Sequence, residues 1–217
     1  MLALARDGYE RGCASFDVDQ DDCALLVIDM QDEFVRPGWT PYWVPGATRA
    51  VPRVLRLIDA CRDAGVPVIY TAFAATHEGL DRPRSGAAMP NRIPGAELDP
   101  EWFHDGRIWD ELAPLPGEVV IQKPSYGAFY DTPLETILKN LGRGTVIVSG
   151  TLTNFCCGTT ARQAYERGFR VVFGSDVTAT DDAELHEAEL KVLRRGFALV
   201  LTCDEILERL VREAAAV

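Results

Sequence analysis

Residues 24–31 read ALLVIDMQ, an apolar run that breaks off at an acid. Five consecutive apolar residues without alternation are typical of a strand that is buried on both faces of a sheet. The next pattern is helical, because apolar residues between Ala50 and Cys61 recur at i, i+3, i+4 and i+7. This predicts an amphipathic helix that ends at Gly65, with Pro52 in its first turn, where a missing N–H is tolerated.

Short apolar runs and helical patterns continue to alternate along the chain. The sequence predicts further strands at 66–70, 118–122, 145–149, 169–173 and 197–201, and helices at 155–167, 183–195 and from about 204. Such alternation is typical of βαβ units, so the expected fold is α/β, a single three-layer domain with a six-stranded, mostly parallel sheet flanked by helices.

The predicted domain covers residues 23–217 and follows an N-terminal extension over residues 1–22. Residues 73–117 hold many prolines and glycines and only a weak helical pattern. A long irregular segment inside a compact domain is usually a functional loop, so we interpret it as an insertion that serves as a lid or an interface.

Composition excludes several classes of partner. The chain has 217 residues, with 22 basic and 33 acidic side chains and a formal net charge of −11. This acidity argues against binding to nucleic acid or to an anionic membrane. No apolar run approaches the length of about 18 residues that a spanning helix needs, and the first residues do not form a signal peptide. The six scattered cysteines then indicate reduced thiols in a cytoplasmic protein.

Three residue types with chemical potential follow predicted strands. Asp29 comes directly after the first strand, Lys123 after the third, and Cys156 and Cys157 after the fourth, in the first turn of a helix. The carboxyl ends of parallel strands meet at one edge of the sheet, where chemistry is usually found. Each feature alone also fits a plain structural role, such as a solvated strand end or a small buried thiol.

Together the three residue types suggest nucleophilic catalysis. A thiol in the first turn of a helix is favoured as a thiolate, and free N–H groups there can hold an oxyanion. An acid could take the thiol proton and a lysine could stabilise the sulfur. Neighbouring helical residues diverge by about 100°, so only one of the two cysteines faces the site. No GxGxxG or GxxxxGK[ST] pattern follows the first strand, and we expect no cofactor.

Three segments resemble the isochorismatase-like cysteine hydrolases: LLVIDMQDEF at 25–34, KPSYGAFYDTPL at 123–134 and SGTLTNFCCGTTARQAYERGF at 149–169. Members of this family include N-carbamoylsarcosine amidase, ureidoacrylate amidase and biuret hydrolase. The resemblance implies that an amide is hydrolysed through a thioester. It also implies a homo-oligomer, either a dimer or a tetramer. By position, Asp29 resembles the general base, Lys123 the lysine and Cys156 the nucleophile of an Asp-Lys-Cys triad. A cis peptide bond at Thr151–Leu152 and an oxyanion hole from the backbone N–H groups of Leu152 and Cys156 are implied as well.

Departures from the family pattern bear on the metal and the substrate. Nicotinamidases in this family carry a metal-binding Asp-x-His after the second strand, where this chain has Thr71 to Ala75. We therefore expect no metal, interpret the three histidines as surface or loop residues, and consider that the pattern argues against a nicotinamidase. These histidines are His77, His104 and His186. Ser125 and Gly127 stand where many relatives have Arg and Ser. If that Arg orients a substrate carboxylate in the relatives, the sequence gives less support for a substrate that carries a carboxylate.

Aromatic residues near the strand ends are the candidates for substrate contact. The expected contacts are Phe34, Trp39, Tyr126 and Phe129, and Tyr42 and Trp43 are further candidates. Aromatic walls suit a small planar amide or ureide, although such residues also pack insertions and interfaces.

Three functions remain open from the sequence. The leading hypothesis is a metal-independent amidohydrolase that cleaves a C–N bond of a small amide, carbamoyl or ureido compound and releases ammonia. An alternative is isochorismate-type vinyl-ether hydrolysis, which needs no cysteine. The other is a thiol redox sensor without enzymatic activity, based on the pair Cys156 and Cys157.

Overall fold

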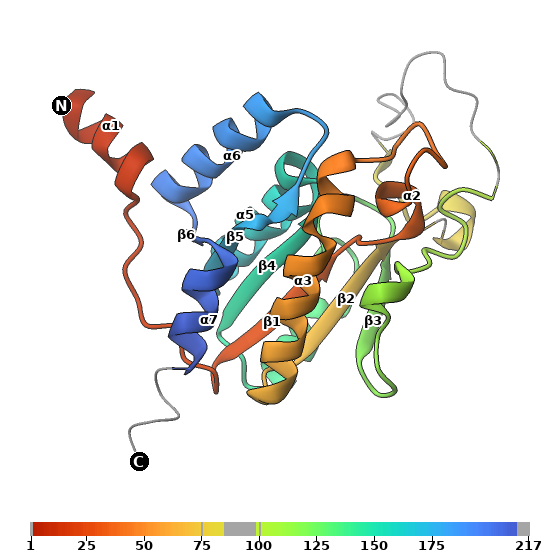
Figure 1. Ribbon diagram of the computed structural model, residues 1–217. Coiled ribbons are helices and arrows are strands. Elements are labelled where there is room, and N and C mark those ends of the chain that lie inside the picture. Colours follow the sequence, from red (N-terminus) through yellow and green to blue (C-terminus); the bar gives the residue numbers. More distant parts are fainter. Residues whose placement is uncertain (1, 75, 85–98, 100, 212–217) are drawn as a thin grey trace.

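The computed structural model describes residues 2–74, 76–84, 99 and 101–211, and its centre is a parallel sheet of six strands (Figure 1). The strand order is β3-β2-β1-β4-β5-β6, and every neighbouring pair is parallel. The strands are β1 Cys23–Ile28, β2 Val68–Phe73, β3 Val119–Lys123, β4 Thr145–Thr151, β5 Arg170–Ala179 and β6 Leu199–Leu201. The predicted α/β class and six-stranded sheet are thus confirmed.

Helices cover both faces of this sheet. They are α1 Leu2–Arg11, α2 Asp32–Val35, α3 Pro45–Asp63, α4 Leu134–Asn140, α5 Gly158–Glu166, α6 Ala183–Gly196 and α7 Cys203–Val211, with short turns η1 Thr76–Gly79, η3 Asp110–Leu112 and η4 Thr153–Cys157. Helices α3 and α7 bury one core with the sheet, and α4, α5 and α6 bury a second core on the opposite face. Strand β1 serves both cores, since Leu25 and Val27 face the first while Leu26 and Ile28 face the second.

Helix α3 is longer than the sequence predicts. It begins at Pro45, the first helical residue after the extended Val44, so Pro52 lies inside the helix and not in its first turn. The prediction for Pro52 is wrong because the apolar face continues back to the buried Ala47, and the packing of that face offsets one missing backbone hydrogen bond. The predicted end is confirmed, because Gly65 follows the helix with a left-handed φ of 70°.

Two segments outside the sheet are tied to the rest of the domain. Helix α1, within the predicted N-terminal extension, packs on α6, where Arg194 donates a hydrogen bond to the Tyr9 carbonyl. From the insertion, Ile108 pairs with Gln31 directly beyond β1, and Trp109 N–H donates to the Met30 carbonyl at 2.9 Å. Residues 85–98 and 100 of the predicted insertion lie outside the described residues. Among the described residues, no helix has the length and apolar character needed to span a membrane.

Candidate active site

Asp29 and Lys123 form a fully buried ion pair at the carboxyl edge of the sheet. Asp29 directly follows β1 with a left-handed φ of 49°, and its N–H donates to the Thr71 carbonyl at 3.0 Å. The Thr71 hydroxyl donates to Asp29 Oδ1 at 2.7 Å, while Lys123 Nζ lies 2.7 Å from Asp29 Oδ2. Both side chains are 0% exposed. One carboxylate thus receives a hydroxyl and an ammonium from two neighbouring strands.

The environment of Lys123 keeps its side chain charged. Its Nζ donates to the Ser125 carbonyl at 2.8 Å and lies 5.4 Å from the centre of the Phe73 ring. Burial alone would lower the pKa of Lys123, but the charge of Asp29 and the contacts with Asp29 and Cys156 raise it above its usual value. The residue is therefore an ammonium beside the carboxylate.

The nucleophile candidate Cys156 lies in the π-helical turn η4, which connects β4 to α5. The approach to this turn is close-packed, because a Cβ on Gly150 would lie 2.0 Å from the Ile28 carbonyl oxygen. The peptide bond Thr151–Leu152 is cis, at the position that the family resemblance implies. The Cys156 sulfur lies within hydrogen-bonding reach of both Asp29 and Lys123. The three residues thus converge from the ends of β1, β3 and β4.

The protonation of Cys156 differs from the expectation of a favoured thiolate. Burial raises the pKa of the Cys156 thiol to about 12, with Lys123 lowering it and the Asp29 charge raising it. The expectation is wrong for the resting protein because Cys156 is only 4% exposed, and desolvation outweighs the helix terminus and the ammonium. The resting Cys156 is therefore a thiol beside the ion pair of Asp29 and Lys123.

Cys157 points to a different environment. Its sulfur lies 3.9 Å from the Ser149 carbonyl oxygen, and the residue is 0% exposed in the core under α5. Burial raises the pKa of Cys157 well above its usual value. Of the two adjacent thiols, Cys156 is the one that meets Asp29 and Lys123.

Of the four predicted substrate contacts, two lie near the three converging residues and two lie elsewhere. Tyr126 lies close to the turn η4 that carries Cys156, since its ring centre is 5.5 Å from that of Phe155, and burial raises the pKa of Tyr126. Phe34 is buried, and the centre of its ring lies 5.4 Å from the centre of the Phe103 ring in the insertion. By contrast, Trp39 is 38% exposed and contacts Arg36.

Phe129 lies outside the triad's surroundings. Its ring is 5.7 Å from Phe169 and contacts the Arg167 guanidinium, in the core between the sheet and α5. The structure therefore gives Phe129 a packing position, because its loop is tied to α5 by a hydrogen bond from its own N–H to Gln163.

Comparison with known proteins agrees with this geometry. The family model described as "Isochorismatase domain" matches residues 23–205. The chain belongs to the isochorismatase family. "Nicotinamidase 3" from Arabidopsis thaliana is 37% identical over 194 residues, covering 87% of this chain and 88% of the relative. "Ureidoacrylate amidohydrolase RutB" from Methylobacterium radiotolerans is 30% identical, covering 81% of this chain and 74% of that protein.

A solved structure of a cysteine hydrolase from Pseudomonas syringae pv. phaseolicola is also similar to this isochorismatase-family chain. The TM-score is 0.80 at 30% identity, covering 90% of this chain and 95% of that one. The chain is thus an isochorismatase-family hydrolase whose relatives include amidohydrolases that act on C–N bonds.

A buried carboxylate that the sequence analysis missed anchors the insertion of this isochorismatase-family fold. Glu33 accepts a hydrogen bond from Phe103 N–H at 2.7 Å and another from Gln31 Nε2 at 2.8 Å. The Phe103 ring then packs against Phe34, Tyr42 and Phe73. The signal in the sequence was the acidic pair Asp32 and Glu33 shortly after the first strand. The partner of Glu33, Phe103, lies 70 residues away in an irregular segment, so the pairing could not be predicted.

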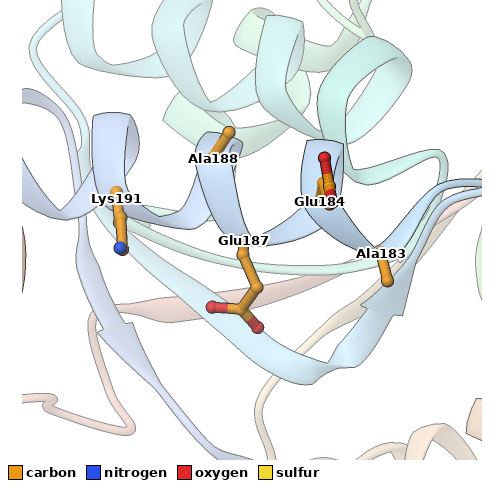
Figure 2. A pocket seen from close by; sticks show the side chains of 5 residues that line it. All are labelled: Ala183, Glu184, Glu187, Ala188 and Lys191. Carbon is orange, nitrogen blue, oxygen red and sulfur yellow. The ribbon is translucent and has the colours of Figure 1, made fainter.

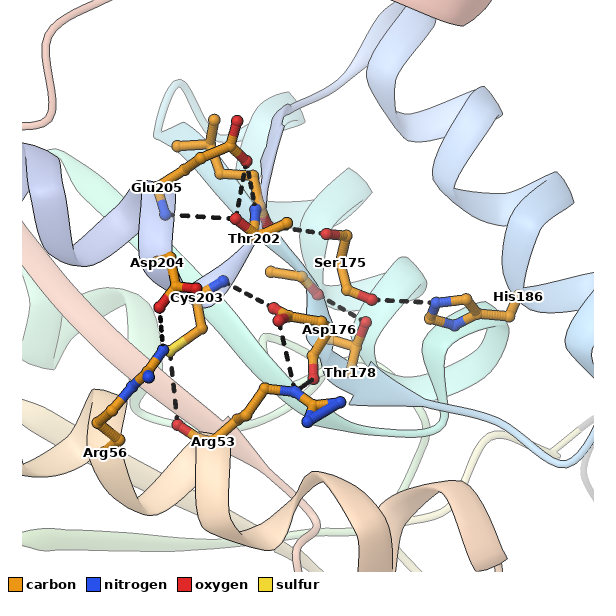
Figure 3. Close-up of polar contacts among 12 residues, drawn as sticks. Arg53, Arg56, Ser175, Asp176, Thr178, His186, Thr202, Cys203, Asp204 and Glu205 are labelled. Atoms are coloured by element: carbon orange, nitrogen blue, oxygen red, sulfur yellow. Dashed lines mark hydrogen bonds and ion pairs between the residues drawn. The ribbon is translucent and has the colours of Figure 1, made fainter.

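His186 corrects another expectation. It is not a surface or loop histidine, because it lies partly buried in α6, where Nδ1 is 2.8 Å from Thr153 Oγ1. Its Nε2 is 3.0 Å from the Ser175 carbonyl oxygen, the contact that Figure 3 shows. The contact forms because the first turn of α6 passes beside η4.

The positions where nicotinamidases of the family would hold a metal have other roles here. Thr71 bonds to Asp29, and the Phe73 ring lies over Lys123, so these residues do not fit a metal ion. Within residues 2–74, 76–84, 99 and 101–211, no group of three His, Cys, Asp or Glu side chains could hold one. That the enzyme works without a metal remains a prediction.

A surface hollow on α6 is separate from the triad. Figure 2 shows its lining, which comes from α6 alone and consists of Ala183, Glu184, Glu187, Ala188 and Lys191. The hollow contains neither the carboxylate, the ammonium nor the thiol of the triad.

Proposed function

We propose that this protein is a cysteine amidohydrolase that cleaves a C–N bond of a small amide, carbamoyl or ureido compound through a thioester and releases ammonia. The observation that carries the proposal is the buried contact of the Cys156 thiol with the Asp29 carboxylate and the Lys123 ammonium. The amidohydrolase relatives support the same reaction class.

The first half of the reaction forms the thioester. Asp29 takes the proton from Cys156 Sγ, and Lys123 stabilises the resulting thiolate, which attacks the amide carbonyl carbon. The backbone N–H groups of Leu152 and Cys156 hold the oxyanion that develops. The protonated Asp29 then donates its proton to the leaving nitrogen, the C–N bond breaks, and ammonia departs.

The second half regenerates the thiol. Asp29 takes a proton from a water molecule, whose oxygen attacks the thioester carbonyl. The C–S bond breaks, the sulfur regains a proton from Asp29, and the acid product leaves. The carboxylate thus acts as base and acid in turn. Its direct contact with both the thiol and the ammonium suits it to this double role.

Tyr126 and Phe34 support a small, planar substrate. The Tyr126 ring packs on Phe155, the residue before Cys156, and Phe34 joins the aromatic group around Phe103 that borders Phe73 and Lys123. Flat apolar walls of this kind favour amides and ureides over bulky acyl groups.

The burial of the two adjacent cysteines weighs against the redox-sensor alternative. Cys156 and Cys157 are 4% and 0% exposed, and burial raises the pKa of both. Sensor cysteines are exposed and have a low pKa. A homo-oligomer and a cytoplasmic location belong to the same proposal, and the six cysteines, all of them free, support a reducing compartment.

The test is ammonia release from biuret, ureidoacrylate, N-carbamoylsarcosine, maleamate and nicotinamide. Nicotinamide stays in this panel because of the 37% identity to "Nicotinamidase 3", although the Asp-x-His pattern is missing. We expect the wild type to release ammonia from at least one compound and Cys156→Ala from none. The matched control is Cys157→Ala, which removes the neighbouring buried thiol and should retain turnover. Turnover that survives in Cys156→Ala would exclude the thioester.

A further inference from the structure

His186 joins helix α6 to the turn that carries the nucleophile. Its Nδ1 lies 2.8 Å from Thr153 Oγ1, and its Nε2 lies 3.0 Å from the Ser175 carbonyl oxygen, the contact drawn in Figure 3. Thr153 is 0% exposed and is the first residue of η4, three positions before Cys156. A side chain of α6 is therefore in direct contact with the start of the nucleophile turn.

The Ser175 carbonyl fixes the direction of one hydrogen bond, and in the neutral form of the ring this also fixes the direction of the other. A carbonyl oxygen can only accept, so Nε2 of His186 carries a proton and donates it to Ser175. In a neutral imidazole the other nitrogen is an acceptor, so Nδ1 accepts from the Thr153 hydroxyl. The ring orientation is thereby defined at both ends, as in a positioned side chain and unlike one that rotates in solvent.

Other contacts make α6 a firm support for this histidine. The Asp182 carboxylate accepts a hydrogen bond from Leu185 N–H at 2.9 Å and caps the helix one turn before His186. Glu189, one turn further along, forms an ion pair with Arg162 of α5. The following residue, Leu190, is buried in the core between α6 and the sheet.

We propose that His186 is a positioning residue for the nucleophile: it holds the Thr153 hydroxyl and, through the turn η4, keeps the Cys156 sulfur against Asp29 and Lys123. His186 does not touch the reacting atoms. Its effect on turnover rests on the proposed thiol mechanism, whereas its effect on the position of the sulfur rests on the contacts alone.

Two substitutions separate the two hydrogen bonds of the histidine. In His186→Asn the side-chain oxygen lies near the place of Nδ1 and can still accept from Thr153. In His186→Gln the amide nitrogen lies near the place of Nε2 and can still donate to Ser175, while the acceptor for Thr153 is lost. We expect His186→Gln to lower kcat about tenfold with little change in KM, and His186→Asn to retain most of the wild-type kcat.

Reactivity of the sulfur measures its position independently of turnover. The folded protein is treated with iodoacetamide, and the modification of each cysteine is followed by mass spectrometry. Cys61, buried on α3 at 0% exposure, reports opening of the whole domain in the same molecule. We expect His186→Gln to change the labelling rate of Cys156 relative to Cys61 at least threefold, and His186→Asn to leave this ratio near the wild-type value.

Leu190→Ala is the matched control, because it weakens the packing of α6 but keeps the imidazole that bonds to Thr153. It should lower the stability and leave the ratio of Cys156 to Cys61 labelling unchanged. The proposal is overturned if His186→Gln also leaves that ratio unchanged, or if Leu190→Ala changes it as much. If the wild type hydrolyses none of the amides, the proposed function fails, but the labelling ratio still decides the role of His186.

Discussion

Lys123 and Asp29 balance one another's charge in a place where neither has access to water. Their charged atoms lie 2.7 Å apart, and both side chains are 0% exposed. Removal of one partner from such a pair leaves an uncompensated charge in the interior, which typically costs about 3–5 kcal/mol. The pair is therefore as important for the folded state as for the proposed reaction.

This balance predicts a specific pattern of stabilities. We expect Lys123→Met to lower the free energy of unfolding by about 3 kcal/mol or more, since it leaves the Asp29 carboxylate alone. The double variant Asp29→Asn with Lys123→Met should be more stable than Lys123→Met, although it is inactive. Urea unfolding of the three proteins measures this, and a double variant less stable than Lys123→Met would contradict the pairing.

The positions of these residues were predictable, but their protonation was not. Asp29, Lys123 and Cys156 each follow a predicted strand, and parallel strands bring their carboxyl ends to one edge. The pKa of Cys156 depends on how completely the sulfur is buried, which is set by packing and not by position in the chain. The contact of His186 with Thr153 was hidden for a similar reason, because it joins residues 33 positions apart.

Among the elements, β4 depends on the absence of a side chain at Gly150. This residue has a φ of 112°, and a Cβ there would lie 2.0 Å from the Ile28 carbonyl oxygen of the neighbouring strand. The strand pair β1 and β4 meets at this point, directly before Asp29 on one strand and the nucleophile turn on the other.

We therefore expect Gly150→Ala to prevent accumulation of folded protein, because the methyl group would force β1 and β4 apart. Gly65→Ala is the matched control, since Gly65 also has a positive φ of 70° but nothing within 4 Å of the added carbon. It should cost only about 1–2 kcal/mol for the left-handed conformation. Soluble yield and thermal unfolding compare the two, and similar values for both would contradict the close approach.

Element boundaries were predicted less well than the elements themselves. The start of α3 was predicted at Ala50 from the apolar periodicity, which put Pro52 in the first turn, yet Pro45 already occupies that place. Propensity is a weak constraint beside the burial of a continuous apolar face. The helix α1 was not predicted, because its stability depends on packing against α6 at the far end of the chain.

For the molecule as a whole, buried thiols predict a loss of stability in alkali. Burial raises the pKa of Cys23, Cys61 and Cys156 to about 12 each. Above pH 9 these thiols ionise in the unfolded chain but keep their protons in the folded one, so the unfolded state binds fewer protons and stability falls as pH rises. The raised pKa of Lys123 acts in the same direction.

The expected fall between pH 8 and pH 10 is about 1 kcal/mol for each such thiol. Urea unfolding under reducing conditions at the two pH values measures it. We expect Cys61→Ala to be less stable than the wild type at both pH values. Its free energy of unfolding should fall less from pH 8 to pH 10, because one titrating group is gone. A free energy of unfolding that is equal at pH 8 and pH 10 would show that the thiols are not protected from ionisation.

The strand order also divides the enzyme into two halves that are continuous in sequence. Strands β1 to β3 come from residues 23–123 and strands β4 to β6 from residues 145–201, and the halves join along β1 and β4. The exposed turn at Gly142 lies between them. A cut in that turn would leave the carboxylate and the ammonium on one fragment and the sulfur on the other. Amide turnover would then require that the two fragments associate, so the protein could serve as a split-enzyme reporter of the association of two polypeptides.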